Sequence, residues 1–153
     1  MGENGKKWEG VKAMFIGEYH YNLDDKGRLV IPSNFKDIIG AKIIIVRGLE
    51  QCLYLYSMNE WEKLITKLTE LSFTKKTNRE FTRLFLSGAY EGIIDIKGRI
   101  NIETLLLKYA NLTKECVIIG AGTRIEIWDK ANWQNYFSSQ NVKLEEISEE
   151  LDL

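Results

Sequence analysis

The chain has 153 residues, of which 44% are hydrophobic and 28% are charged, and its formal net charge is −1. This composition is that of an ordinary globular protein and excludes disordered, collagen-like and coiled-coil classes. The length suits one domain, and the longest aliphatic run, residues 43–46, is far too short to span a membrane. Two cysteines do not make a secreted disulfide framework, so we expect a cytoplasmic protein.

Charge is unevenly distributed along the chain. Residues 140–153 carry one lysine and five carboxylates, whereas residues 1–139 carry 20 basic and 17 acidic side chains. An excess of three positive charges is much weaker than the basic footprint of a typical nucleic-acid-binding domain. A ring or a dimer can nevertheless concentrate that excess on one face, so the net charge neither indicates nor excludes a nucleic-acid partner.

Short strands and helices are expected in a regular order. Residues 1–13 lack the apolar segment of a signal peptide, and we expect an N-terminal extension that is disordered or foreign to the natural chain. The next segments are a strand ending at 19–23, a Lys-Gly turn, a strand over 28–31, a helix over 33–39 and paired strands over 42–46 and 52–56. Two capping boxes, Ser57–Glu60 and Thr77–Glu80, predict helices that end near Leu71 and at Leu86.

The same order then returns. We expect strands ending at 93–95 and over 99–102, a helix over 104–110, paired strands over 116–119 and 124–128, and a helix after Asp129. The acidic end of the chain is either a last amphipathic helix or a solvated tail. Small strands joined by tight glycine turns predict a compact barrel-like β core surrounded by helices.

An internal repeat underlies this order. Residues 23–31 (LDDKGRLVI) and 94–102 (IDIKGRINI) share Asp, Lys-Gly-Arg and a final Ile at an offset of 71. Residues 53–56 with Trp61 match residues 125–128 with Trp133 at an offset of 72, which Gly48 and Gly120 also keep. One inserted residue before the later strands accounts for the change. The chain is therefore interpreted as a duplication.

The repeated turn contains residues suited to DNA. Its members are Asp24, Lys26, Gly27 and Arg28 in the first copy, and Asp95, Lys97, Gly98 and Arg99 in the second. Arginine can bind guanine O6 and N7 through two hydrogen bonds, an aspartate four residues earlier can hold the guanidinium as a bidentate pair, and lysine suits phosphate. The alternative is a salt bridge that only braces a β-hairpin, and spacing alone favours that alternative.

Several segments together resemble the bacterial MraZ family. They are MFIGEY at 14–19, LDDKGRLVIP at 23–32, FTRLFLSGA at 81–89, LTKECV at 112–117 and RIEIW at 124–128. The resemblance implies an α+β protein with a mainly β core, in which two fused SpoVT/AbrB-like units form a swapped-hairpin barrel with flanking helices. It implies repeats at 15–61 and 87–133, linking helices at 62–86, and a C-terminal helix with acidic tail at 134–153.

The resemblance also implies a function. It indicates a sequence-specific transcriptional regulator of the bacterial division and cell wall gene cluster, including its own promoter, located at the nucleoid. The family's D-x-x-x-R motif falls on Asp24 and Arg28 and again on Asp95 and Arg99. The expected partners are double-stranded DNA with tandem repeats and further copies of the chain in a ring. In the second copy, Asp95 and Arg99 either contact DNA or brace the barrel or another subunit.

Two other functions stay open. One is an AbrB-like protein-interaction module, antitoxin-like or a structural ring, without direct DNA reading. The other is a small enzyme that uses Asp24, Asp25 and Asp95, which requires a pocket that joins them to another reactive group. His20 is the only histidine, and Cys52 and Cys116 are expected to be packed core thiols. We therefore expect no catalysis, metal, cofactor, membrane partner or small-molecule substrate.

Three further features have ordinary interpretations. Gly120-Ala-Gly122 is expected to be a hairpin turn and not a dinucleotide-binding loop. Trp61, Trp128 and Trp133 are expected to anchor the core. A basic cluster near the start of the second linking helix is interpreted first as a solvated face, and second as a contact for DNA or for the acidic tail; its members are Lys75, Lys76, Arg79 and Arg83.

Overall fold

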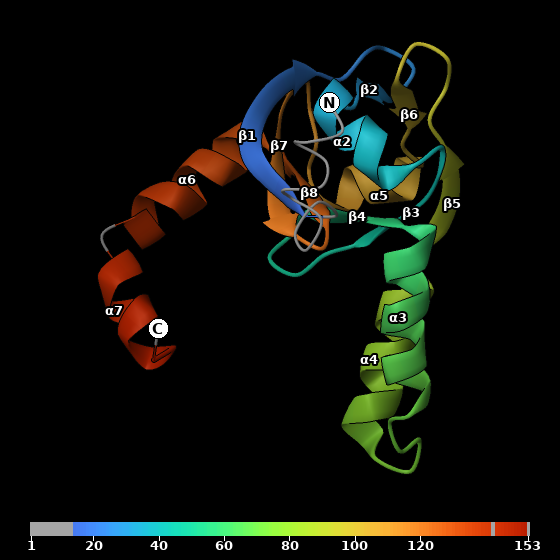
Figure 1. The fold of residues 1–153 in the computed structure, drawn as a ribbon, viewed down its shortest axis with the longest axis vertical. Coiled ribbons are helices and arrows are strands. Elements are labelled where there is room, and N and C mark those ends of the chain that lie inside the picture. Colours follow the sequence, from blue (N-terminus) through green and yellow to red (C-terminus); the bar gives the residue numbers. More distant parts are fainter. Residues whose placement is uncertain (1–13, 142, 153) are drawn as a thin grey trace, which may run out of the picture.

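A computed structural model of the chain describes residues 14–141 and 143–152, and the N-terminal extension expected at 1–13 lies outside this part. The first half contains strands and helices in the order β1 (Phe15–Asn22), β2 (Arg28–Val30), α2 (Ser33–Ile39), β3 (Lys42–Arg47), β4 (Leu53–Ser57), α3 (Met58–Thr69) and α4 (Lys76–Leu86). The second half contains β5 (Tyr90–Ile93), β6 (Arg99–Asn101), α5 (Thr104–Tyr109), β7 (Glu115–Gly122), β8 (Ile125–Asp129), α6 (Lys130–Asn141) and α7 (Leu144–Glu150). The fold is α+β with a mainly β core, and the order β-β-α-β-β occurs twice (Figure 1).

The two halves exchange strands. A six-stranded antiparallel sheet has the order β1-β7-β8-β4-β3-β5, and a separate two-stranded ribbon joins β2 to β6. The first strand of each half thus pairs with the third strand of the other, β1 with β7 and β5 with β3. Because every such pairing joins segments far apart in sequence, neither half completes its own sheet. None of the described helices is long and apolar enough to cross a membrane.

The expected closed barrel is not formed. In the described part of the chain, β1 and β5 are the two edges of the sheet and do not pair with each other. The β2–β6 ribbon, α2 and α5 cover the core instead, through the buried side chains of Leu29, Phe35, Ile100 and Leu106. With these elements covering the apolar face, closure by strand pairing is not needed to bury it.

The strand register changes the alignment of the two repeats. Ile45 pairs with Leu55 and Ile118 pairs with Ile127, so β3 and β7 correspond at an offset of 73 while β4 and β8 keep 72. Two residues, not one, are therefore inserted before β7, and the following hairpin loses one. Gly120 consequently corresponds to Arg47, and its expected equivalence with Gly48 is wrong.

The sheet separates two apolar clusters. On one face, Leu53 and Leu55 of β4 pack into the larger cluster beneath the ribbon. On the other face, Tyr54 and Tyr56 pack with Trp128 under α3, α4 and α6. This alternation is the period of two that a strand buried on both faces requires.

The tryptophans and cysteines lie where the sequence places them. Trp128 is buried, and Trp61 and Trp133 pack against the same cluster as core anchors. Cys52 and Cys116 are both buried, which confirms packed thiols, and burial raises the pKa of Cys116 to about 11.

The two linking helices differ in how they begin. The Ser57 hydroxyl accepts a hydrogen bond from the Glu60 backbone N–H at 3.1 Å, so the cap predicted for α3 is confirmed. α4 begins at Lys76 without a side-chain cap, so the second capping box is wrong. Asn78 and Arg79 fix that turn instead by donating side-chain hydrogen bonds back to backbone carbonyls of residues 72–74.

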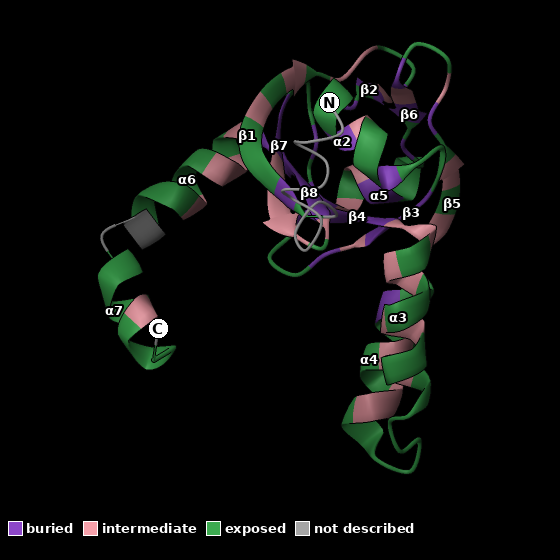
Figure 2. Ribbon diagram, viewed as in Figure 1, coloured by how far each residue is buried: buried purple, intermediate pink, exposed green. Residues whose placement is uncertain are grey.

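Helices α3 and α4 run together away from the sheet, whereas α6 and α7 leave it on another side (Figure 1). Both projections are largely exposed or half-buried along their length (Figure 2). The acidic end of the chain is thus an exposed helix, α7, preceded by α6, which follows β8 directly.

Candidate nucleic-acid interface

The β2–β6 ribbon positions both Asp-x-Lys-Gly-Arg turns. The Ile102 backbone N–H donates to the Gly27 carbonyl and the Ile31 backbone N–H donates to the Gly98 carbonyl, each at 2.9 Å. Each turn is therefore anchored on the strand end of the other repeat. The two turns lie at the end of the molecule opposite the α3–α4 projection (Figure 1).

In the first turn, the Asp24 carboxylate organises the backbone and the arginine together. Its Oδ1 accepts hydrogen bonds from the backbone N–H groups of Lys26 and Arg28, both at 2.9 Å. Its Oδ2 accepts from Arg28 Nε at 2.7 Å. The second turn repeats this geometry, with all three corresponding distances from Asp95 at 2.9 Å. We call this arrangement the aspartate clamp.

The clamp differs from the expected bidentate pair. Because Oδ1 is occupied by two backbone N–H groups, the carboxylate holds the guanidinium through Nε only. The terminal nitrogens of Arg28 and Arg99 have no hydrogen-bond partner among the described residues. A guanidinium fixed at Nε with free terminal nitrogens retains two NH2 groups, and so four N–H donors, for a base edge or a phosphate.

The clamp also controls charge and backbone shape. The Arg28 backbone N–H is the main cause that lowers the pKa of Asp24, and the Arg99 backbone N–H does the same for Asp95, so both carboxylates are ionised at neutral pH. Gly27 and Gly98 both have φ of +78°, a conformation that favours glycine. The sequence prediction of a glycine-dependent turn is confirmed in both copies.

Two lysines that sequence analysis did not assign lie beside these turns. Lys114, in the second repeat, lines the same open hollow as Asp24, Lys26 and Arg28 in the first. Lys36, in the first repeat, lies beside Gly98, with Nζ 3.4 Å from the position a β-carbon would take there. Both lysines reach these positions because the repeats exchange strands, and this exchange cannot be read from the linear sequence.

The turns differ in their neighbours. Leu107 lies beside Gly27 of the first turn, in the position that Lys36 takes beside Gly98 of the second turn. The first turn has Lys114 instead, whose carbonyl accepts a hydrogen bond from the Leu23 backbone N–H at 2.7 Å. Each turn thus combines its own lysine and arginine with one lysine of the other repeat.

Acid–base chemistry has little basis at these turns. The Asp24 and Asp95 carboxylates are occupied by three hydrogen bonds each and have lowered pKa values, whereas a general acid requires a raised one. The hollow beside Asp24 contains no thiol, imidazole or serine hydroxyl. His20 lies on β1 and pairs with Glu18 at 2.8 Å, an exposed contact. Across residues 14–141 and 143–152, no three His, Cys, Asp or Glu side chains gather as metal ligands would.

Comparison with known proteins identifies the family. A family model described as "MraZ protein, putative antitoxin-like" matches residues 14–84 and again residues 85–153. The chain belongs to the MraZ family. Each of the two matched segments contains one aspartate clamp, so the MraZ match spans both turns.

Individual MraZ relatives match almost the whole chain. A transcriptional regulator MraZ of Lactobacillus delbrueckii subsp. bulgaricus is 50% identical over 139 residues, which cover 91% of this chain and 97% of the relative. Proteins of the same name from Lactobacillus helveticus and Lactobacillus gasseri are 49% and 48% identical over the same length and the same shares.

Proposed function

We propose that the chain is a sequence-specific DNA-binding transcriptional regulator, of the type that controls the bacterial division and cell wall gene cluster including its own promoter. The proposal includes a cytoplasmic, nucleoid-associated location. Support comes from the names of the Lactobacillus relatives. The single observation that carries it is the aspartate clamp, which holds Arg28 at Nε and leaves its terminal nitrogens free.

The proposed contacts follow from the chemistry of the turn. The terminal nitrogens of Arg28 donate to guanine O6 and N7 in the major groove, a contact that contributes about 1–3 kcal/mol of discrimination. Lys26 and Lys114, as point charges, neutralise phosphates. Gly27 lets the backbone turn tightly. In the second turn, Asp95, Lys97, Gly98 and Arg99 repeat the arrangement, with Lys36 in the supporting position.

The simplest alternative is that the aspartate clamp only stabilises the hairpin. Its geometry indicates that it also orders Arg28 for binding. The Asp24 bonds to the Lys26 and Arg28 backbone N–H groups are sufficient to fix the turn. The additional bond to Nε fixes the direction of a side chain that is about a third exposed. Ordering an arginine before binding reduces the entropy lost on association, which benefits recognition more than folding.

We further propose that several copies assemble into a ring that presents the turns to tandem DNA boxes, with repeats at 15–61 and 87–133 supplying the two turns of each chain. Weak contacts linked in one assembly gain affinity through high effective concentration. Boxes spaced by one helical turn, about 10–10.5 bp, place successive contacts on one DNA face. Exposed apolar side chains on α4, on α7 and on the turn between α3 and α4 support self-association.

The test uses a duplex taken from upstream of the chain's own coding sequence, here called the promoter duplex, and a shuffled duplex of equal composition. Fluorescence anisotropy measures both affinities from 50 to 200 mM salt. Wild type should prefer the promoter duplex, and Arg28→Ala should weaken that affinity about 5- to 150-fold. Lys63→Ala, which removes one positive charge on α3, should retain the preference.

Lysine variants separate phosphate contacts from base contacts. Lys26→Ala and Lys114→Ala should each weaken both duplexes to a similar extent and reduce the salt slope by about one. Unchanged binding by Arg28→Ala would refute the assignment of that residue. Failure of wild type to bind any duplex at any salt concentration would favour a protein-interaction module instead.

A further inference from the structure

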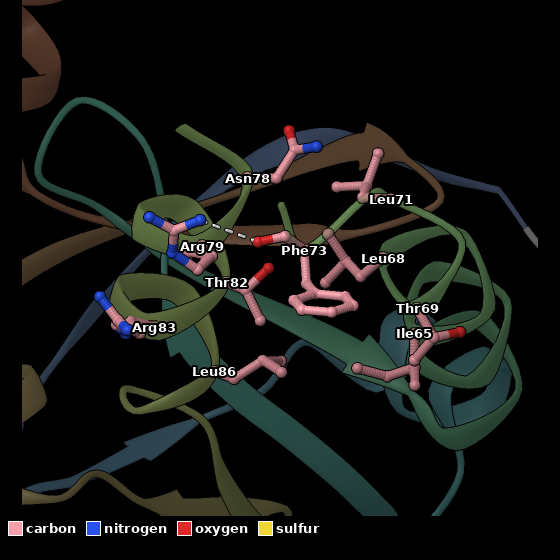
Figure 3. A pocket seen from close by; sticks show the side chains of 10 residues that line it. All are labelled: Ile65, Leu68, Thr69, Leu71, Phe73, Asn78, Arg79, Thr82, Arg83 and Leu86. Atoms are coloured by element: carbon pink, nitrogen blue, oxygen red, sulfur yellow. Dashed lines mark hydrogen bonds between the residues drawn. The ribbon is translucent and has the colours of Figure 1, made fainter. Parts of the chain in front are cut away.

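The α3–α4 projection carries an exposed apolar groove. Ile65 and Leu68 of α3, Phe73 of the connecting turn and Leu86 of α4 surround a cavity of about 380 Å³ (Figure 3). The ring of Phe73 points among these side chains (Figure 3), and the residue as a whole is 78% exposed. An exposed apolar surface of this kind on a soluble domain marks an interaction site.

The edge of the groove is positively charged. Its two ionisable residues are Arg79 and Arg83, and no carboxylate lines it. Arg79 donates to the carbonyl of Phe73 (Figure 3) and also to that of Thr74, and so holds the turn. Arg83 has no side-chain partner within the described part of the chain and remains available to an acidic ligand.

Helix α7 has the complementary surface. Leu144 and Ile147, with Leu151 just beyond the helix, follow the i, i+3, i+7 spacing of one helix face and are 69%, 42% and 61% exposed. At about 100° per residue, Glu145 and Glu150 flank this apolar stripe. A short helix with apolar residues on one face and glutamates beside them matches an apolar groove edged by arginines.

We propose that α7 of one copy docks in the α3–α4 groove of a second copy. The copy is a different one because α7 and the α3–α4 projection of the same chain lie apart (Figure 1). Because the groove and α7 are different surfaces of the chain, their contact is head-to-tail, and such contacts close into a ring when the rotation per subunit permits. The contact rests on the self-association proposed above and names the surfaces that form it.

The first experiment measures the mass of the full chain and its variants by sedimentation at several concentrations, without DNA. Phe73→Asp and Ile147→Asp each place a carboxylate in the contact and should raise the dissociation concentration roughly tenfold or more. Leu105→Asp is the matched control, because Leu105 on α5 is 63% exposed and lies in neither surface. It should retain the wild-type mass.

The second experiment tests the contact by cross-linking. A Phe73→Cys chain is mixed with an Ile147→Cys chain and oxidised, and a disulfide-linked pair should form. Leu105→Cys mixed with Ile147→Cys should not form one, and buried Cys52 and Cys116 do not compete. Circular dichroism of each variant confirms that substitutions at these exposed positions leave the fold intact.

Two results would overturn the docking proposal. One is wild-type mass for both aspartate variants, which would assign the groove to another partner; the other is absence of the Phe73–Ile147 cross-link. A DNA-binding test on the same variants keeps the two proposals separate. Loss of assembly with retained affinity for a duplex carrying one box supports both, whereas failure of wild type to bind any duplex refutes only DNA recognition.

Discussion

Replacement of Asp24 by asparagine tests the clamp while changing few atoms. The amide oxygen introduced by Asp24→Asn can keep the contacts to the Lys26 and Arg28 backbone N–H groups, so the turn should persist. The amide N–H₂ group, however, then faces Arg28 Nε, and two donors replace a charge-assisted hydrogen bond of 2.7 Å. Asp24→Asn therefore releases the arginine without deleting it.

The expected magnitude follows from the freedom that Arg28 regains. Immobilising a side chain with many rotamers on binding costs about 0.5–1.5 kcal/mol, which corresponds to a factor of about 2–12 in affinity. The substitution also removes one negative charge near phosphate, which strengthens binding to every duplex. The freed arginine weakens binding to the promoter duplex, whereas the lost negative charge strengthens binding to both duplexes. The ratio of the two affinities cancels the charge effect and keeps the effect of the freed arginine.

Anisotropy titrations of both duplexes give that ratio, and Asp25→Asn is the matched control. Asp25 is the exposed neighbour, and its carboxylate has no hydrogen-bond or ion-pair partner among the described residues. Both variants should bind the shuffled duplex more tightly at low salt, but only Asp24→Asn should lower the ratio by about 2- to 12-fold. An equal ratio in the two variants would refute the ordering role of the clamp.

Two further predictions concern stability. A β-carbon at Gly120 would clash with the Ile16 backbone, so Gly120→Ala should separate β1 from β7 and cost about 1–3 kcal/mol or more. Gly92→Ala is the control, because Gly92 does not have a positive φ and its added β-carbon would lie 3.5 Å from the nearest atoms, so it should change stability by less than about 1 kcal/mol. Urea unfolding measures both, and equal losses would contradict the packing argument. The lowered pKa values of Asp24 and Asp95 mean that their stabilisation is present above the unfolded pKa and is lost as pH falls through the folded pKa, below about pH 4. The variant with both Asp24→Asn and Asp95→Asn should therefore lose less free energy of unfolding than wild type between pH 6 and pH 3. An identical loss in the two proteins would contradict a stabilising role of the two carboxylates.

Local features of the fold were predictable from the sequence because their causes are local. The α2 helix, the Ser57 cap and the glycine turns each depend on residues within four positions. The Thr77 cap failed although its pattern was equally good. There, Asn78 and Arg79 tie the preceding turn through backbone carbonyls, and the helix begins two residues earlier than predicted, with Lys75 in the cap position.

Features that depend on strand exchange were not predictable in the same way. Two residues are inserted before β7 and one is lost in the next hairpin, so the sequence alignment of the repeats shows a net insertion of only one. The pairing of Ile118 with Ile127 reveals both changes. The covering of the core by the β2–β6 ribbon, in place of a closed barrel, depends on long-range packing. Lys36 and Lys114 were missed because each lies beside the turn of the other repeat.

The most direct test of DNA recognition by the first turn is unbiased selection of random duplex DNA, at physiological salt, by wild type and by Arg28→Ala. Wild type should recover direct repeats spaced by about one helical turn, and Arg28→Ala should recover no such repeats. Recovery of the same repeats by both proteins would contradict the role of Arg28. Recovery of no sequence by either protein would contradict DNA recognition altogether.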